Sequence, residues 1–185
     1  MQAGRSLFRR LIVPALAAGA AWLCASAAQA QSLEYPVKAN YLARFAAFVT
    51  WPSGALGAGN APITVCVVGT DPFGATLDQA LASQTVNGRR LAARRLNRLS
   101  ADSGCDIAYV AGSSQQSVSE ALAAVAGRPV LTVTDEVRGS ARGIVHFTIF
   151  QNRVRFHIDD QLATRGRMSI SSRLLSLALS VSGAG

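Results

Sequence analysis

The chain has 185 residues, a formal net charge of +8 at pH 7 and a hydrophobic content of 50%. This length is sufficient for one domain with a hydrophobic core. No nucleic-acid-binding motif accompanies the basic charge, and no apolar run reaches the ~18 residues that span a membrane. The sequence therefore argues against a nucleic-acid-binding protein and against an integral membrane protein.

Residues 1–30 have the organisation of a signal peptide. Arg5, Arg9 and Arg10 precede an apolar stretch from Leu11 to about Ala25, and Ala28-Gln29-Ala30 is a small-x-small cleavage pattern. We predict cleavage after Ala30, export, and one mature domain of residues 31–185. Without the three arginines the mature chain has fifteen Lys and Arg against ten Asp and Glu, a net charge of about +5.

An aromatic helix is predicted after the cleavage site. The stretch "YLARFAAFVTWP" (residues 41–52) contains four aromatic rings, and apolar residues from Val37 to Val49 recur at the spacing of an α-helix. Glu34 suits the helix N-terminus, and Pro52 biases Trp51 towards extended geometry, so we expect the helix to end there. The aromatic stripe is either the seam that docks this helix onto a core or a surface for a partner.

The middle of the chain alternates between strand and helix patterns. β-branched runs between turn residues predict buried strands. Asp71 is expected to cap a short helix with Pro72 at its first position, and Gly127 to end another helix. The predicted strands are "ITVCVVG" (63–69), "RRLAARRL" (89–96), "CDIAYVAG" (105–112) and "RPVLTVTD" (128–135), and the predicted helices are "PFGATLDQALAS" (72–83) and "SQQSVSEALAAVAG" (114–127).

Two cysteines remain after the predicted cleavage, Cys66 and Cys105. An even number of cysteines in an oxidising compartment predicts a disulfide, which would close a loop of 39 residues (105 − 66) and stabilise the domain by about 4 kcal/mol. The alternative is two buried free thiols. Two cysteines without a neighbouring histidine do not predict a metal site.

Much of the basic charge lies in "GRRLAARRLNRL", residues 88–99, which contains five arginines. The first interpretation is a solvated strand and loop. The second is a surface for an acidic protein partner.

The end of the sheet is predicted as a β-hairpin. "IVHFTIF" (144–150) and "RVRFHID" (153–159) alternate with period two, and Gln151-Asn152 between them would form the turn. In this register one face is apolar and the other is polar. The apolar pairs are Val145 with Ile158, Phe147 with Phe156 and Ile149 with Val154, and the polar pairs are His146 with His157, Thr148 with Arg155 and Phe150 with Arg153.

His146 and His157 have three interpretations. They could share a metal ion with Asp159 or Asp160, act as a pH sensor, or be two half-exposed side chains on a solvated sheet face. Because only two ligands are positioned by the register, we expect the third of these and no metal site.

The final segment, "MSISSRLLSLALSV" (168–181), is predicted to form an amphipathic helix. Its apolar stripe would pack on the core, with binding of a partner as the alternative; the stripe consists of Ile170, Leu174, Leu177, Ala178 and Val181. The elements together predict a single α/β domain with a mixed sheet of about six strands, flanking helices and a C-terminal β-hairpin.

Signatures of catalysis are weak. No Gly-x-Ser-x-Gly elbow is present, and "GTDPFG" (69–74) follows a strand but matches neither the dinucleotide fingerprint nor the P-loop. A hydrolytic site of His146, His157 and Asp159 is conceivable, but no sequence motif supports it. We therefore predict no enzyme, no catalytic residue and no cofactor.

The order of several segments resembles the YfiR family of exported bacterial proteins. The resemblance extends from about Tyr35 to Val181, and this chain departs from the usual family pattern around the hairpin. Arg142-Gly143 stands where members typically have Gly-Gly, and the residues near His146, His157 and Asp159 also differ. Some members carry a further cysteine pair. The matching segments are "VKANYLARFAAFVTWP", "ITVCVVGTDPFG", "VNGRRLAARRL", "CDIAYVAGS", "VLTVTDE", "GIVHFTIFQNRVRFHID" and "MSISSRLLSLALSV".

The resemblance implies a periplasmic regulator that restrains an inner-membrane diguanylate cyclase by binding its periplasmic domain, with effects on cyclic di-GMP and biofilm formation. The alternative is a periplasmic module that binds a small molecule between the N-terminal helix and the hairpin. We expect Phe45 and Phe48 to pack on the sheet. The resemblance does not decide between a monomer and a homodimer. The candidate surface for a partner or ligand consists of Tyr41, Trp51, His146, Arg155 and His157.

Overall fold

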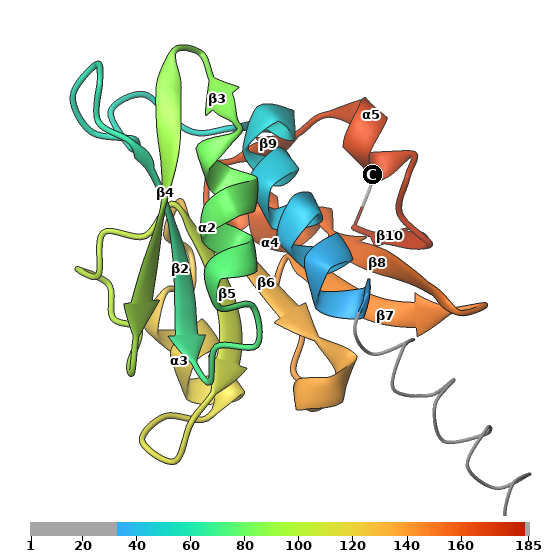
Figure 1. Cartoon of the computed structure of the whole chain (residues 1–185). Coiled ribbons are helices and arrows are strands. Elements are labelled where there is room, and N and C mark those ends of the chain that lie inside the picture. The colour runs from blue at the N-terminus through green and yellow to red at the C-terminus, as the bar shows by residue number, and fades with distance from the viewer. Residues whose placement is uncertain (1–32, 184–185) are drawn as a thin grey trace, which may run out of the picture.

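A computed structural model describes residues 33–183 of the chain, which form one α/β domain around an eight-stranded mixed sheet (Figure 1). The strand order is β10-β8-β7-β6-β5-β2-β4-β3. The six predicted strands are all present, and two short edge strands, β3 and β10, complete the sheet. The strands are β2 (Ile63–Gly69), β3 (Thr85–Val86), β4 (Arg89–Leu96), β5 (Ile107–Gly112), β6 (Leu131–Asp135), β7 (Val145–Phe150), β8 (Arg153–Asp159) and β10 (Ser180–Ser182).

The five strands β4, β2, β5, β6 and β7 are parallel, whereas β8 is antiparallel to β7. Strands β2, β5 and β6 are buried along most of their length, which explains their nearly continuous apolar sequences. Burial on both faces requires covering layers on both sides of the sheet.

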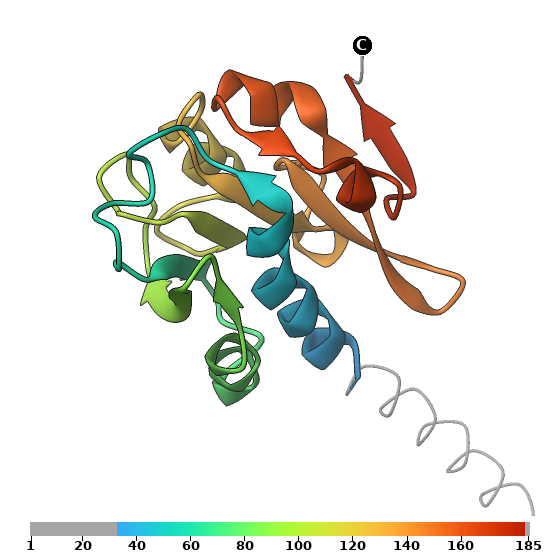
Figure 2. The same cartoon turned by 90° about the horizontal axis from the view of Figure 1, so that it is seen from above.

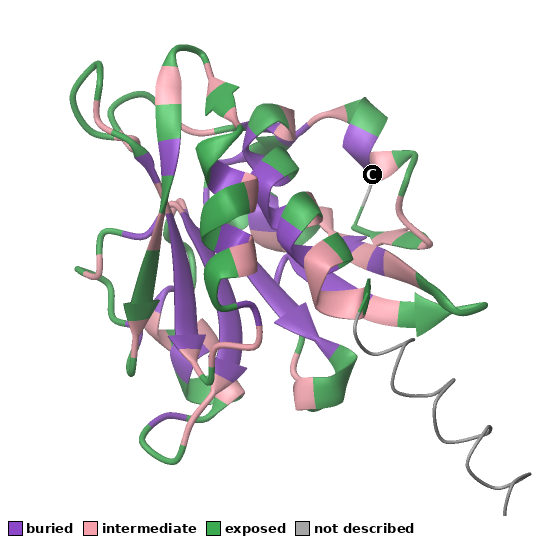
Figure 3. Ribbon diagram, in the orientation of Figure 1, coloured by how far each residue is buried: buried purple, intermediate pink, exposed green. Residues whose placement is uncertain are grey.

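Helices cover the two faces of the sheet (Figure 2). The N-terminal helix, residues 33–45, and α2 (Ala75–Ala82) lie on one face, and α3 (Val118–Ala124) lies on the other. The larger hydrophobic cluster lies beneath the N-terminal helix and α2, and a smaller one lies beneath α3. Purple in Figure 3 marks the buried central strands between these layers.

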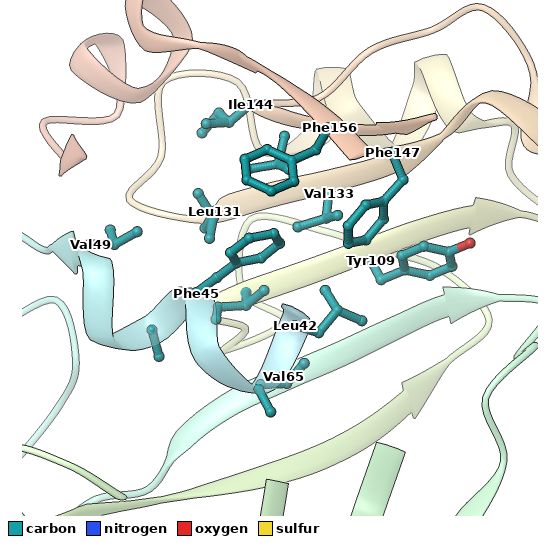
Figure 4. Packing of buried hydrophobic residues seen from close by; sticks show 14 of the residues in the cluster. Leu42, Phe45, Val49, Val65, Tyr109, Leu131, Val133, Ile144, Phe147 and Phe156 are labelled. Atoms are coloured by element: carbon teal, nitrogen blue, oxygen red, sulfur yellow. The ribbon is translucent and has the colours of Figure 1, made fainter. Parts of the chain in front are cut away.

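Aromatic rings dock the N-terminal helix onto the sheet (Figure 4). Phe45 is 1% exposed, and its ring centroid lies 5.9 Å from that of Phe147 and 5.6 Å from that of Phe156. Edge-to-face and offset arrangements at such distances are favourable beyond the apolar area that they bury. The prediction that Phe45 packs on the sheet is confirmed, and Phe48 is half-buried against the same cluster.

The predicted end of the N-terminal helix at Trp51 was wrong. The α-helix ends at residue 45, a 3-10 turn η1 (Ala46–Phe48) follows, and β1 (Val49–Thr50) pairs with β9 (Ser169–Ile170). Val49 and Thr50 are β-branched residues, which suit a strand once a partner strand is available. That partner is 120 residues later in the chain, so no local pattern indicates it.

The predicted amphipathic helix over residues 168–181 was also wrong. The segment forms β9, a single helical turn α5 (Ser172–Leu175) and β10, which pairs in parallel with β8. The Ser171 side chain accepts a hydrogen bond from the Arg173 N–H and so begins the short turn. Ile170 and Leu174 are buried as expected, but Leu177 is 54% exposed.

The two middle helices are present with shorter bounds than predicted. Asp71 does not cap α2 directly: its Oδ1 accepts hydrogen bonds from the N–H groups of Phe73 (2.8 Å) and Gly74 (3.2 Å), and the helix begins at Ala75. Pro72 therefore lies in the preceding turn. Helix α3 begins with a capping box between Ser117 and Glu120.

The predicted disulfide between Cys66 and Cys105 is confirmed. It joins β2 to the segment before β5, with 5.8 Å between the Cα atoms, and both cysteines are buried in the smaller cluster. The bridge therefore lies within the core on the α3 side of the sheet.

The basic stretch forms β4, as the interpretation of a solvated strand required. Arg89 Nη1 donates to the carbonyl oxygens of Leu56 (2.9 Å) and Ala61 (2.8 Å), which holds the loop before β2. Arg95 forms ion pairs with Asp71 and Asp78, which lie before and within α2. Part of the basic charge thus has internal partners.

Candidate functional site

A groove of about 640 Å³ lies between the N-terminal helix and the β7–β8 hairpin. We call it the helix–hairpin groove. Both walls come from segments that Figures 1 and 2 show side by side, with the hairpin tip projecting beyond the helix. The lining residues are Leu33, Glu34, Val37, Tyr41, Ile149, Asn152, Arg153, Val154 and Arg155.

The helix wall consists of Glu34 and three residues with apolar side chains or rings, Leu33, Val37 and Tyr41. Leu33, Val37 and Tyr41 are four positions apart, so they lie on one face of the helix. Leu33 is 67% exposed and Val37 is 41% exposed, whereas the Tyr41 ring packs against Phe156 with 5.5 Å between centroids. The wall therefore passes from the aromatic core at Tyr41 to open apolar surface at Leu33.

The hairpin wall follows from the strand register. The predicted register is confirmed at all six pairs, and Gln151 and Asn152 form the turn with φ of 50° and 57°. On the apolar face the pair Phe147–Phe156 lies beneath the aromatic rings of the helix. The next pair, Ile149 with Val154, lies nearer the tip and lines the groove.

Two arginines give the groove a basic rim. Arg153 and Arg155 belong to its lining, and Arg155 Nη2 donates to the Leu177 carbonyl oxygen at 3.4 Å. The acidic lining residue, Glu34, forms an ion pair with Lys38. The groove thus combines an apolar interior with uncompensated positive charge, which suits an apolar partner segment with acidic neighbours.

A buried ion pair holds the helix that forms one wall. Lys38 is fully buried and pairs with Asp135, whose side chain is also fully buried at the end of β6. The Tyr109 hydroxyl donates to the same carboxylate at 3.1 Å. Burial, and next the Asp135 charge, raise the pKa of Tyr109, so this hydroxyl remains a donor. These contacts fix the helix against the sheet.

Of the candidate residues, the structure brings together Tyr41 and Arg155, both in the groove lining. Trp51 does not line it: its ring is partly buried against the larger cluster, and its Nε1 has no hydrogen-bond partner among residues 33–183. Trp51 is therefore part of the structural seam rather than of this surface.

His146 and His157 do not line the groove either. They are paired across the strands as predicted, but on the opposite face of the hairpin from Ile149 and Val154. His146 is only 3% exposed, so its interpretation as half-exposed was wrong. Its Nδ1 lies 2.9 Å from Thr134 Oγ1, and His157 Nδ1 lies 2.7 Å from Ser180 Oγ.

Two observations concern metal binding and the membrane. Within residues 33–183 no group of three or more His, Cys, Asp or Glu is arranged to hold a metal ion. In the same part of the chain, no helix has the length and apolar content needed to cross a bilayer.

The buried histidine predicts a pH dependence of stability. Burial, and next the Arg142 charge, lower the pKa of His146 below 6.5. His157 lowers this pKa by a smaller amount, whereas the charges of Asp135 and Glu136 raise it. A pKa that is lower in the folded state means that the unfolded state binds more protons, so stability is full above pH ~6.5 and falls as the pH decreases. We expect urea unfolding between about pH 7.5 and 5.5 to show this loss.

The control for this prediction is His146→Gln, which cannot titrate. Its stability should change less over the same interval, while carboxylates such as Glu136, whose pKa is also lowered, act at more acidic pH. An equal slope in both proteins would show that His146 is not responsible.

Sequence reasoning missed most of the groove. The candidate residues did not include five residues of the lining: Leu33, Val37, Ile149, Arg153 and Val154. The sequence contained two relevant signals, which were the spacing of Leu33 and Val37 with Tyr41 and the register of the hairpin. The missing information was that this face of the helix lies opposite the Ile149–Val154 pair of the hairpin, which depends on tertiary packing.

The family comparison agrees with this architecture. A family model described as YfiR/HmsC-like matches residues 35–179, a range that includes most of the N-terminal helix, the hairpin and the disulfide. No curated protein matches the chain. Proteins of this family are regulatory rather than catalytic. Because the match extends over most of the sequence, the chain belongs to the YfiR/HmsC-like family, whose members are known as periplasmic regulators of cyclic di-GMP signalling.

Proposed function

We propose that this protein is exported to the periplasm and restrains an inner-membrane diguanylate cyclase by binding its periplasmic domain in the helix–hairpin groove. Family membership supports the general role, and the groove supports the location of the contact. Reduced cyclic di-GMP synthesis and reduced biofilm formation are the expected consequences.

The observation that carries this proposal is the clustering of exposed apolar side chains. Residues 33–183 expose six large apolar side chains, of which Leu33, Val37 and Ile149 line the groove, whereas Phe150 lies on the opposite face of the hairpin tip. Contiguous apolar surface with a polar rim is typical of protein-binding sites. The other two, Val137 and Leu177, lie outside the groove lining.

Removing apolar contacts from both walls should weaken the complex. Val37→Ser together with Ile149→Ser replaces one exposed residue on each wall. Because central apolar contacts cost about 2 kcal/mol or more when truncated, we expect the dissociation constant to rise at least about 30-fold. Isothermal titration calorimetry with the purified periplasmic domains of the host's cyclases measures this.

Leu177→Ser is the matched control, because Leu177 is 54% exposed and does not line the groove. It should bind like the wild type. Equal affinity of the groove variant and the wild type would contradict the location, whereas the absence of binding by any host cyclase domain would contradict the proposed partner.

The cellular test compares cyclic di-GMP with and without the gene. Deletion should raise cyclic di-GMP, an export-competent wild-type copy should restore it, and the Val37→Ser, Ile149→Ser copy should not. Unchanged cyclic di-GMP on deletion, under several envelope stresses, would refute the regulatory role.

A second candidate function is the binding of a small molecule in the same groove. The observation in its favour is the groove volume of about 640 Å³, which lies in the range of ligand pockets. A small ligand should raise the melting temperature of the isolated protein with saturation, whereas a pure protein-binding regulator responds only to its partner.

A further inference from the structure

A second pocket lies on the α3 side of the sheet, away from the N-terminal helix. It has a volume of about 270 Å³ and is lined by the end of α3, the segment 127–130, the segment 142–144 and α4 (Asp160–Arg165). We call it the α3–α4 pocket. Its lining shares no residue with that of the helix–hairpin groove.

The interior of the α3–α4 pocket is apolar. Val125, Val130 and Ile144 are buried side chains of its lining, and Leu122 and Leu162 are half-buried ones. Ala123 and Ala126 are exposed at the surface of α3 and the turn after it. A small apolar group can therefore lose its hydration in this pocket.

Three arginines from three different segments line the same pocket: Arg128, Arg142 and Arg165. No acidic residue belongs to the lining. Arg128 has partners outside the pocket, since Nη2 donates to the Ala101 carbonyl oxygen at 3.3 Å and lies 4.0 Å from Asp102. In residues 33–183 the side chains of Arg142 and Arg165 form no ion pair and no hydrogen bond.

The backbone that carries Arg142 is held in place. The N–H groups of Gly143 and Ile144 donate to the hydroxyls of Thr134 (2.9 Å) and Thr132 (3.0 Å). A Cβ atom at position 143 would lie 2.8 Å from the Thr132 carbonyl oxygen, so only glycine permits this close approach to β6. The segment is therefore packed on the sheet, and Arg142 stands at a preformed pocket.

The positive charge of Arg142 acts on His146 and His157. After burial, the Arg142 charge is the next cause that lowers the pKa of both His146 and His157. The charges of Asp135 and Glu136 act on His146 in the opposite direction. An anion bound beside Arg142 would reduce its effect on the two histidines.

We propose that the α3–α4 pocket binds a small anionic amphiphile, a carboxylate or phosphate group attached to a short apolar body. The guanidinium groups of Arg142 and Arg165, with Arg128 near them, receive the oxyanion, because their planar donors suit carboxylate and phosphate geometry. The apolar body contacts Val125, Val130 and Leu162. The small volume selects a compact ligand or the end of a larger one.

The experiment uses the purified protein and four soluble probes: hexyl phosphate, hexanoate, inorganic phosphate and hexanol. Calorimetry should give saturable binding of hexyl phosphate and hexanoate, at least about tenfold tighter than inorganic phosphate and hexanol, because only the amphiphiles satisfy both halves of the pocket. Binding should also raise the titration midpoints of His146 and His157, the only two histidines of the chain, in NMR spectra.

Three variants locate the site. Arg142→Gln and Arg165→Gln should each weaken hexyl phosphate binding about tenfold, through loss of a charge-assisted contact. Ala123→Leu should fill the pocket from the exposed surface of α3 and weaken binding without removing charge. Arg90→Gln is the matched control, because Arg90 is exposed on β4, lies outside the pocket and loses the same charge.

A vesicle arm identifies the source of the ligand. Sedimentation with phosphatidylglycerol vesicles but not phosphatidylcholine vesicles, lost in Arg142→Gln, would assign the anion to a lipid. Binding of hexyl phosphate without vesicle binding would assign it to a free molecule.

Three results would overturn the proposal. They are the absence of saturable binding of every amphiphile and vesicle, equal affinity of inorganic phosphate and hexyl phosphate, and wild-type affinity in both arginine variants.

Discussion

Asp135→Asn should lower the free energy of unfolding by about 3–5 kcal/mol, because it leaves the buried Lys38 ammonium without its main partner. Both side chains of this ion pair are fully buried, and the pair joins the N-terminal helix to the end of β6. Lys38 also contacts Glu34, which is partly exposed, so a fraction of the pairing survives. Urea unfolding at neutral pH measures the loss.

A double variant separates the charge from the packing. Lys38→Met with Asp135→Asn removes both charges, and it should be less destabilised than Asp135→Asn alone, because no fully buried charge remains unpaired. Glu34 loses its partner in this variant, but its side chain is 16% exposed and can be hydrated. Asp78→Asn is the control for an exposed pair: Asp78 pairs with Arg95, both side chains are solvent-accessible, and the expected cost is below about 1 kcal/mol. Similar losses at Asp135 and Asp78 would mean that burial does not set the energy of the pair.

Asp135→Asn also tests the helix–hairpin groove. The helix that carries Lys38 also carries Leu33, Val37 and Tyr41, so loosening it should disturb one wall of the helix–hairpin groove. We expect Asp135→Asn to weaken binding of the cyclase domain while the β7–β8 hairpin remains folded. Hydrogen exchange of residues 33–45 in the variant would show whether the helix is the segment that opens.

Removal of the disulfide should lower the free energy of unfolding by an amount similar to that expected for Asp135→Asn. The bridge closes a loop of 39 residues, so Cys66→Ala with Cys105→Ala should lower the free energy of unfolding by about 4 kcal/mol in the chain-entropy model. For a domain of this size the melting temperature should fall by about 10 °C. Because both cysteines are buried, the alanines also leave a small cavity, which adds to the loss.

Reduction provides the control for this prediction. The wild type in the presence of a thiol reductant should approach the stability of the double alanine variant, and the variant itself should not respond to the reductant. Equal stability of the oxidised and reduced wild type would contradict the expectation and indicate that the unfolded chain is already compact around this loop. Binding of the cyclase domain by the reduced wild type would then show whether the bridge only stabilises the domain.

Local patterns were sufficient for the hairpin. Alternation with period two on both sides of Gln151-Asn152 leaves one register for a two-residue turn, and a shift by one residue would turn Phe147 and Phe156 towards the other face. The disulfide was predictable for a different reason, since two cysteines in the mature chain allow only one pairing. Both predictions rest on information within short segments or on simple counting.

Long-range pairing limited the prediction of both ends of the described chain. Val49–Thr50 and Ser169–Ile170 become strands because they pair with each other, and Ser180–Ser182 becomes a strand because it pairs with β8. Two- and three-residue strands have too little pattern of their own to compete with a helical period. The burial of His146 has a related cause, because its partner hydroxyl comes from Thr134 on a neighbouring strand.

The sequence by itself determined the fold class, the six main strands, the hairpin register and the cysteine pair, because each depends on periodicity, turn residues or number. Only the tertiary structure decided where the surface sites lie. The helix–hairpin groove exists because the N-terminal helix covers the pair Phe147–Phe156 but not the pair Ile149–Val154. The α3–α4 pocket exists because three arginines from separate segments meet at one apolar hollow. Both sites depend on how helices, strands and loops that are distant in the sequence pack against one another, which no local pattern encodes.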